Sequence, residues 1–425
     1  MVRLTRLRID RFRNVKPGTD LRFGPTFNVL LGKNATGKST LLDLIAAVTN
    51  DDLSAYAKED AGFDLTWWLE NGEGNVEVRA VRTPVRAVAL LDEAREATEF
   101  DDAWTIVIRA AETEVGRVEV TGSRGTFKPT GQPDESFEVS VGLTAGGARF
   151  RGIIAIVVKS TWGNDRVVDP PRTPQAQAFQ IARRVLAHGH AGRFDEATST
   201  FEAITRSGLV LNHDTERTFQ SFDPRLPTGL FLRVPTSREP LVVRFADLSA
   251  LAEIPGVIGF RSAELRPRLL RQSQSGAVET TEYQGFDFLF CRTDGSTISH
   301  DLLSFGQKRL FSFLWYFAVR REHPIVADEL LNGLHHEWIE ACFNRLRDRQ
   351  SFLATQHPFL LDHIPIESAE SVSTTFIRCA IERDADSGER LAWRNFDEEE
   401  AERFFIAYQT GIQQVSEVLR TEGLW

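Results

Sequence analysis

Hydrophobic and polar residues alternate at the start of the chain and then give way to a continuous apolar run. Residues 2–9 follow the period-2 pattern of a half-buried strand. Residues 27–31 are almost all apolar, as in a buried parallel strand. Apolar residues then recur at helical spacing over 41–48. The pattern predicts a strand, a loop over 32–40 and a helix, in that order.

Several β-like segments follow between residues 63 and 160, and turn-forming clusters separate them. These segments cover residues 65–69, 76–79, 104–108, 117–120 and 153–158. They predict a mostly antiparallel sheet, with a helix around 92–98.

The pattern changes near residue 169, where Asp-Pro-Pro interrupts it. Helical periodicity appears over 175–188 and 194–206, and a short arginine-rich segment comes later. Its basic residues are Arg261, Arg266, Arg268 and Arg271. We interpret residues 166–278 as an inserted subdomain of mixed helices and short strands.

Regular alternation returns near residue 286. Asp294-Gly295 predicts a hairpin turn between 286–290 and 297–299. Further on, the pattern predicts helices over 310–319 and 336–347, strands over 324–327 and 351–355, and an amphipathic C-terminal helix from about 398. That helix would place on one side Phe404, Phe405, Tyr408, Ile412, Val415 and Leu419.

The loop over 32–40 carries the first chemical signal. It reads Gly-Lys-Asn-Ala-Thr-Gly-Lys-Ser-Thr and matches G-x-x-x-x-G-K-[ST], the phosphate-binding loop of P-loop ATPases. Lys38 carries a charge toward the β- and γ-phosphates, and the Ser39 hydroxyl is offered to Mg²⁺. The predicted nucleotide-binding residues in this loop are Asn34, Ala35, Thr36, Gly37, Lys38, Ser39 and Thr40.

Composition narrows the class of protein. The 425 residues have a formal net charge of −10, so the surface as a whole does not match nucleic acid, although a local basic groove remains compatible with it. The three cysteines are far apart, which indicates neither a disulfide framework nor a zinc site. No stretch reaches the ~18 apolar residues of a membrane span, and the N-terminus is strand-like, so we expect a cytoplasmic protein.

An acidic pair, Asp328 and Glu329, follows the strand expected over 324–327. Asp328 would hold Mg²⁺, and Glu329 would polarise the water that attacks the γ-phosphate. A single Asp-Glu pair is more often a solvated surface feature. Here its place in the chain supports a site, because a Ser-x-Gly turn precedes it and a histidine closes the next strand.

That order of motifs resembles the ATP-binding-cassette (ABC) branch of P-loop ATPases, in particular the RecF, SMC and OLD-type ATPases of DNA repair and phage defence. The resemblance is carried by Arg13 in the N-terminal basic element, the phosphate loop over 32–40, Ser304 and Gly306 in a signature-like segment, the Walker B strand with Asp328 and Glu329, a D-loop over 332–335, and His357 as the switch histidine.

Each of these residues also has a simpler interpretation. Ser304 could only cap the following helix, His357 could be a core histidine, and Arg13 could be a solvated edge-strand residue. His335 and His336 suggest metal binding, but adjacent histidines on one helix should point to different sides, so we do not expect a metal there.

The sequence departs from the family pattern at three points. Phe305 stands where the signature has its first glycine, and no clear Q-loop glutamine follows the phosphate loop. The stretch after Pro358 is too short for the Toprim domain of OLD nucleases, so no intrinsic nuclease is expected.

The resemblance implies an α/β fold: a P-loop ABC-type ATPase head with an antiparallel β lobe and an inserted mixed α/β subdomain. We expect an N-terminal ATPase lobe over 1–165, the insertion over 166–278 and a C-terminal ATPase lobe over 279–425. In this family, the signature of one protomer faces the phosphate loop of another, which implies a homodimer with ATP and Mg²⁺ between two copies.

The predicted activity is ATP hydrolysis that acts on DNA or switches a partner effector, such as a nuclease encoded nearby, in DNA repair or anti-phage defence. An ATP-gated interaction scaffold with little hydrolysis is the alternative. An ATPase subunit of a transporter suits the N-terminal basic element and the large insertion less well.

Overall fold

The computed structural model describes residues 1–50, 53–56, 59, 61–72, 74–84, 102–121, 124–130, 134–138, 177–178, 181–182, 185–186, 193–194, 201–213, 218–222, 226, 242–276, 278–319, 323–355, 358–384, 388–411, 413–421 and 423. The chain divides into two compact units. The first comprises Met1–Gly189, Glu322–Pro324 and Ile364–Trp425, and the second comprises His190–Arg321 and Ile325–His363.

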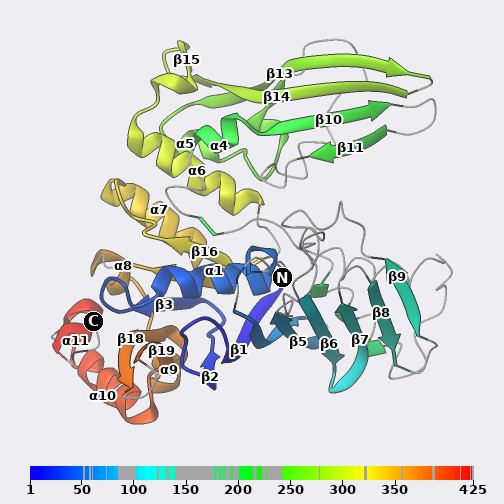
Figure 1. The fold of residues 1–425 in the computed structure, drawn as a ribbon. Helices are drawn as coiled ribbons and strands as arrows, with labels where there is room; N and C mark the ends of the chain where they lie inside the picture. The colour runs from blue at the N-terminus through cyan, green and yellow to red at the C-terminus, as the bar shows by residue number, and fades with distance from the viewer. Residues whose placement is uncertain are drawn as a thin grey trace. The chain divides into compact units, whose positions relative to one another are not determined.

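An 8-stranded antiparallel sheet forms much of the first unit, in the order β2-β1-β4-β5-β6-β7-β8-β9 (Figure 1). Its strands are β1 (Arg3–Arg11), β2 (Thr19–Arg22), β4 (Phe63–Asn71), β5 (Gly74–Pro84), β6 (Asp102–Ala110), β7 (Thr113–Thr121), β8 (Arg124–Pro129) and β9 (Glu135–Glu138). Alternation explains their pairing, since Val76, Val78 and Ala80 on β5 are buried while their neighbours are not. The expected antiparallel lobe is therefore confirmed.

The phosphate loop of the first unit lies between β3 (Phe27–Leu31) and α1 (Lys38–Thr49). All five residues of β3 are buried, as its apolar run predicts. β18 (Phe376–Asp384) pairs with β3 in parallel, and β19 (Gly388–Asn395) pairs with β18 antiparallel. The expected α/β arrangement around the loop is thus present.

The C-terminal segment of the first unit contains α9 (Ala369–Thr375), α10 (Glu398–Gln409) and α11 (Val415–Thr421). The single amphipathic helix expected from about residue 398 is therefore two helices. The chain turns between them at Gly411, whose φ of 66° a glycine adopts without strain. Ile412 lies outside the described residues.

A second antiparallel sheet belongs to the second unit, in the order β11-β10-β14-β13-β12, with β15 paired to β14. Its strands are β10 (Gly208–His213), β11 (Thr218–Phe222), β12 (Val243–Arg244), β13 (Ser262–Ser275), β14 (Val278–Cys291) and β15 (Thr297–Ser299). The hairpin expected at Asp294-Gly295 is confirmed, because β14 and β15 pair around it and Gly295 has a φ of 87°.

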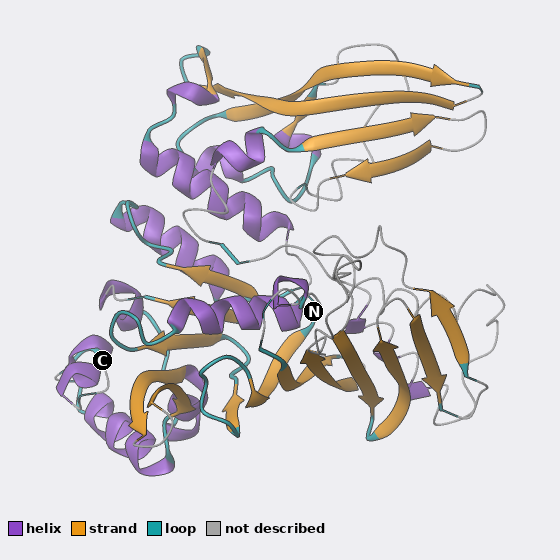
Figure 2. Cartoon of the chain, viewed as in Figure 1, coloured by secondary structure: helices purple, strands orange, loops and turns teal. Residues whose placement is uncertain are grey.

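Helices α4 (Phe201–Thr205), α5 (Ile254–Val257) and α6 (Phe305–Val319) lie on one side of this sheet (Figure 2). An aromatic cluster fills the space between. Phe288 on β14 contacts Phe311 and Trp315 on α6, with ring centroids 5.1 and 5.5 Å apart. Phe201 on α4 adds a fourth ring, 5.1 Å from Phe311. Such edge-on contacts fix α6, and with it the segment at its N-terminus, against the sheet.

The remaining elements of the second unit are β16 (Ile325–Asp328), α7 (His336–Leu346), β17 (Ser351–Ala354) and α8 (Pro358–Asp362). β16 and β17 pair in parallel, and both are buried over most of their length. The predicted strand–helix–strand order after residue 324 is therefore confirmed.

Some predicted elements lie wholly or partly outside the described residues. The helix around 92–98 and the strand over 153–158 lie outside them, and the helix over 175–188 is described only in short pieces. Short strands were expected before residue 278, but β13 has 14 residues and pairs along its length with β14, which begins at Val278. The division at 165 and 278 itself stays a prediction.

Among the helices of the described ranges, none is both long and apolar enough to span a bilayer.

Candidate nucleotide-binding site

Two glycines allow the phosphate loop to pack closely against β18 and β19. Gly32 has a φ of 150°, and a Cβ there would stand 2.2 Å from the carbonyl oxygen of Cys379 on β18. Gly37 has a φ of 82°, and a Cβ there would stand 2.8 Å from Leu391 Cδ1. Packing against backbone therefore requires glycine at position 32, whereas at position 37 the neighbours are side chains and the positive φ is the main reason for glycine.

Lys38 is held inside the loop. Its Nζ donates to the carbonyl oxygens of Gly32 and Lys33, at 2.7 and 2.9 Å, and the residue is only 9% exposed. Thr36 Oγ1 donates to the same Lys33 carbonyl at 2.8 Å. The backbone therefore curls around one ammonium group, which is the arrangement that places a cation beside a bound phosphate.

Helix α1 starts at Lys38 without a side-chain cap, because glycine precedes it. The first N–H groups of a helix have no partner within the helix, and together with the helix dipole they favour an anion. Asn34, Ala35 and Ser39 are exposed at this end of α1, whereas Thr36 is buried and Thr40 is half-buried. The loop thus fits the triphosphate that the sequence predicts.

Trp393 on β19 is a loop contact that sequence reasoning missed. Its indole Nε1 donates to the carbonyl oxygen of Thr36 at 3.1 Å, and the side chain is buried. Cys379, whose carbonyl oxygen limits Gly32, is also buried, and this burial raises the pKa of its thiol to about 12. No local pattern marks either residue, because both come from strands far along the chain.

Arg13 follows β1 and has a left-handed φ of 44°. Its Nε donates to Glu59 Oε1 at 3.1 Å, and its guanidinium lies 5.3 Å from the ring of Tyr56. The hydrogen bond to Glu59 raises the pKa of Arg13 above its ordinary value. Arg13 is therefore engaged by a carboxylate of its own unit, and its role toward the nucleotide stays a prediction.

In the second unit, Asp328 ends β16 beside an arginine that sequence reasoning missed. Arg193 Nη1 lies 3.6 Å from Asp328 Oδ2, and the two side chains are 19% and 16% exposed. The backbone strengthens the contact, since Asp328 N donates to the carbonyl of Phe194 at 2.9 Å. Arg193 lies in a segment without a motif, which explains why the sequence did not reveal it.

Glu329 is held in a conformation that a glutamate rarely adopts, with a φ of 46°. Its N–H donates to the carbonyl of Ala354 on β17 at 3.0 Å, and its own carbonyl accepts from Arg309 Nη2 at 3.0 Å. Arg309 is buried, and its guanidinium lies 4.8 Å from the ring of Phe194. Strained backbone of this kind persists where surrounding contacts fix it, often at functional sites.

Ser304 caps helix α6. Its Oγ accepts from Gln307 N at 3.2 Å, while Gln307 Oε1 accepts from Ser304 N at 3.0 Å. This reciprocal pair is a capping box. The simpler interpretation of Ser304 is thus confirmed, and its signature role, which the cap does not exclude, stays a prediction.

The signature-like segment packs on the predicted D-loop. A Cβ on Gly306 would stand 2.8 Å from Trp338 on α7, and one on Gly333 would stand 2.5 Å from the ring of Phe305. Glycine at 306 is therefore required by close packing. Phe305, which departs from the family pattern, is 62% exposed.

The premise that His335 and His336 point to different sides of one helix is wrong, whereas the expectation that no metal binds there stays a prediction. The rings of His335 and His336 lie 4.1 Å apart, and their donor atoms lie within 4.8 Å of a Glu337 oxygen. His335 precedes α7 with an extended backbone, so the spacing rule for helical neighbours does not apply to it. His357, the predicted switch histidine, lies outside the described residues.

The structure thus groups the predicted site residues by unit. The first unit brings together the loop residues 32–40, and the second brings Asp328 and Glu329 together at the end of β16. The residues present suit the expected groups: Lys38 and the first N–H groups of α1 suit a phosphate, and the Ser39 hydroxyl and the Asp328 carboxylate are oxygen ligands of the kind that Mg²⁺ prefers.

Residues 6–89 match a protein family described as an AAA domain. The matched segment includes the phosphate loop, and its description agrees with the P-loop nucleotide-binding class that the motif indicates. No curated protein matches the chain.

Several solved structures are similar to this chain at low sequence identity. An SMC head domain from Thermotoga maritima is 12% identical with a TM-score of 0.33, over 93% of this chain and 99% of that chain. An SMC head domain bound to the C-terminal domain of ScpA, derived from Pyrococcus furiosus, is 11% identical with a TM-score of 0.37, over 96% and 100%. One from Pyrococcus yayanosii is 10% identical with a TM-score of 0.38, over 96% and 100%. Similarity at this level carries no argument about function.

Proposed function

We propose that the protein binds and hydrolyses ATP, and that ATP joins two copies of the chain. The observation that carries the proposal is the phosphate loop, in which Lys38 Nζ is held by the Gly32 and Lys33 carbonyls at the start of α1. A cation beside the free N–H groups at the start of a helix supports phosphate binding at this loop. Negative charge that accumulates on the γ-phosphate during hydrolysis would be stabilised there.

The hydrolytic step requires a base beside the γ-phosphate. Glu329 would accept a proton from the attacking water, and its fixed backbone would hold the carboxylate in one place. Asp328 and Ser39 would hold Mg²⁺, which supplies charge neutralisation between the β- and γ-phosphates when bound.

The composite site would need two chains, because this chain has one phosphate loop and one signature-like segment. Ser304 and Gly306 of one copy would face the γ-phosphate held by the loop of the other. The capping position supports this, since the N-terminus of α6 is another helix end that favours an anion. A head-to-tail homodimer with two ATP molecules follows.

Sedimentation of Glu329→Gln with and without ATP tests the assembly. The amide cannot take a proton from water, so the closed dimer should accumulate with ATP. Ser304→Arg in the same background should remain monomeric because its side chain fills the space of the γ-phosphate. Ser304→Ala is the matched control: it loses the cap, at a cost of about 1 kcal/mol, but leaves that space open. If Glu329→Gln with ATP sediments as it does without ATP, the assembly proposal fails.

We further propose that the ATP state acts on a partner effector, such as a nuclease encoded nearby, with DNA as a second candidate, in cytoplasmic DNA repair or anti-phage defence. Arg261, Arg266, Arg268 and Arg271 are exposed at or along β13. Carboxylates already accompany two of them, since Arg266 pairs with Glu264 and Arg268 Nε lies 3.6 Å from Asp287. This partial neutralisation favours a protein partner over a phosphate backbone.

The role of these four arginines in binding a partner or DNA can be tested separately from ATP hydrolysis. Replacement of all four by glutamate should leave basal ATP hydrolysis near the parent rate and remove stimulation by DNA or by the product of a neighbouring gene. Stimulation that survives the replacement would exclude β13 as the contact surface.

One observation favours an ATP-gated scaffold with little hydrolysis as the second candidate. Arg193 pairs with Asp328, so the carboxylate expected to hold Mg²⁺ is already partly neutralised. Single-turnover and steady-state measurements of ATP hydrolysis separate the two functions. A protein that forms the ATP dimer but turns over far more slowly than once per minute would be a scaffold.

A further inference from the structure

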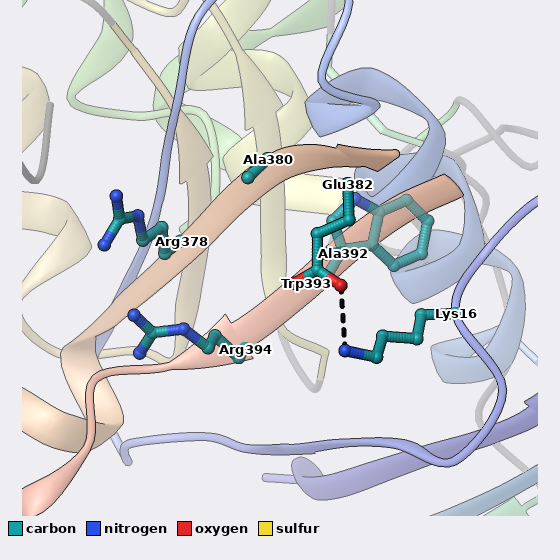
Figure 3. Close-up of a pocket in the computed structure, with 7 residues that line it drawn as sticks. All are labelled: Lys16, Arg378, Ala380, Glu382, Ala392, Trp393 and Arg394. Carbon is teal, nitrogen blue, oxygen red and sulfur yellow. Dashed lines mark hydrogen bonds and ion pairs between the residues drawn. The ribbon is translucent and has the colours of Figure 1, made fainter. Parts of the chain in front are cut away.

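A cavity of about 240 Å³ lies on the hairpin of β18 and β19 in the first unit. It is lined by Lys16, Arg378, Ala380, Glu382, Ala392, Trp393 and Arg394. Figure 3 shows Arg378 and Arg394 reaching in the same direction at one end, with Lys16 and Glu382 at the other. Apart from Trp393, whose indole contacts the phosphate loop, none of these residues belongs to the candidate nucleotide-binding site.

The strand register explains why the surface is hollow here. Ala380 and Ala392 are directly opposite each other, and Arg378 faces Arg394 in the next pair on the same side. Two short side chains therefore form a floor between longer ones. Trp393 keeps that floor in place, because it is 3% exposed and its Nε1 donates to the Thr36 carbonyl at 3.1 Å.

The paired arginines place two guanidinium groups side by side on the same face of the hairpin. Like charges directly opposite on neighbouring strands repel one another. Glu400 on α10 offsets one of them, with Oε1 2.6 Å from Arg394 Nη2 but 3.4 Å from Arg378 Nη1. Among the described residues, Arg378 makes no closer ion pair, and its side chain is 37% exposed.

Lys16 and Glu382 balance each other at the opposite end, with Nζ and Oε2 2.8 Å apart. Asp397 Oδ2 also lies 3.9 Å from Arg394 Nη1, so three carboxylates accompany the three cations, and Arg378 has only the 3.4 Å contact to a carboxylate that Arg394 holds more closely. Planar guanidinium groups suit phosphate oxygens, because their N–H donors match the oxygen spacing. The cavity is smaller than the roughly 300–1,000 Å³ of pockets for larger ligands, so it suits a single phosphate group and not a whole nucleotide.

We propose that this cavity binds the phosphate group of a small molecule, through Arg378 and Arg394 with Lys16 at the opposite end. It is a second anion site, on the side of the β18–β19 hairpin that carries Ala380 and Ala392, and it does not depend on ATP hydrolysis. The site holds its ligand by charge and by the fixed spacing of the two guanidinium groups.

Calorimetric titration with inorganic phosphate tests the site in full-length Lys38→Ala, because this background weakens phosphate binding at the loop. Ionic strength is held constant with sodium chloride, since screening would otherwise mimic weaker binding. We expect saturable binding of one phosphate per chain. Adding Arg378→Gln should weaken it about tenfold or more, the effect of one lost charge-assisted hydrogen bond.

Arg383→Gln is the matched control. Arg383 lies on the same strand, is 84% exposed and pairs with Glu389 outside the cavity, so its loss should leave phosphate affinity unchanged. Lys16→Gln gives a second test variant should Arg378→Gln not fold, because Lys16 is 55% exposed and the ion pair that it loses, with Glu382, is at the surface.

No saturable binding in Lys38→Ala, or equal affinities in the Arg378→Gln and Arg383→Gln variants, would overturn the proposal. Ribose 5-phosphate distinguishes the source of the group. Comparable binding of this ester supports a phosphomonoester as ligand, whereas binding of inorganic phosphate alone supports the free ion.

Discussion

The carboxylate of Asp328 faces the guanidinium of Arg193, with Oδ2 and Nη1 3.6 Å apart in a largely buried setting. Any Mg²⁺ that binds Asp328 must share this carboxylate with the arginine or displace it. A nearby positive charge makes a carboxylate a weaker ligand for a second cation. The pair is therefore the feature of this site that most affects the metal requirement.

Arg193→Gln should lower the Mg²⁺ concentration that half-saturates ATP hydrolysis by about fivefold, because one partly buried ion pair is worth about 1 kcal/mol. Mg²⁺ titrations of steady-state hydrolysis measure the effect. Arg345→Gln is the control, since it removes another ion pair of the same unit, to Glu253 at 3.2 Å. An unchanged Mg²⁺ requirement in Arg193→Gln would mean that the ion pair does not compete with the metal.

The left-handed backbone of Glu329 predicts opposite effects on stability and activity. Glu329→Gly should abolish hydrolysis, because the base is gone, yet raise the free energy of unfolding by about 1 kcal/mol, because glycine adopts a φ of 46° without strain. Glu329→Ala should lose hydrolysis without the gain in stability. Denaturant unfolding of the three proteins measures the difference, and equal stability of the two variants would contradict the strain.

Because Gly306 packs on Trp338, a side chain at position 306 should lower stability, and a smaller side chain at position 338 should restore it. Gly306→Ala places a Cβ 2.8 Å from the indole, so it should displace α7 and lower the free energy of unfolding by about 1–3 kcal/mol. Gly306→Ala combined with Trp338→Leu should recover much of that loss, since the smaller side chain makes room. Additive effects of the two substitutions in thermal unfolding would show that the contact is not the cause.

Much of the fold follows from local pattern. Alternation predicted β1 and the antiparallel lobe, and the apolar run before Gly32 predicted the buried β3. The sequence pattern predicts a single C-terminal helix, because apolar residues recur at helical spacing on both sides of Gly411. Glycine nevertheless often ends a helix, and it does so here. The long pairing of β13 with β14 was missed, since exposed polar residues along both strands hide their alternation.

The candidate site also has residues that local sequence predicts and residues that it does not. The phosphate loop and the carboxylates after β16 follow from motifs whose chemistry needs those residue types. Arg193, Arg309 and Trp393 could not be predicted, because each reaches the site from a distant segment and has no motif of its own. Tertiary contacts, and not local sequence, select such residues.

Acid should remove the contribution that the ion pair between Glu400 and Arg394 makes to the free energy of unfolding. Arg394 lowers the pKa of Glu400 from 4.5 to about 2, chiefly through their hydrogen bonds. A lowered carboxyl pKa in the folded state stabilises the protein above pH ~4.5, and this contribution is lost as the pH falls toward 2. Because the Arg394 side chain is 44% exposed, solvent screening reduces its size to on the order of 1 kcal/mol.

Glu400→Gln should therefore be less stable than the parent at neutral pH, and the gap should close between about pH 4.5 and 2. The amide retains an oxygen for the capping box with Asp397, so helix α10 should persist. Glu399→Gln is the control, because its carboxylate is 81% exposed and pairs with Arg403 at the surface. A stability difference that does not change with pH would contradict the assigned ion pair.

ATP hydrolysis by Glu329→Gln, measured beside ATP binding by the same protein, tests the central claim most directly. We predict that ATP binds with the affinity of the parent, because the phosphate loop is untouched, and that hydrolysis falls by about 100-fold or more, because no base remains for the attacking water. Lys38→Ala should lose binding itself. Hydrolysis by Glu329→Gln at the parent rate would contradict the assignment of this residue and the ATPase mechanism built on it.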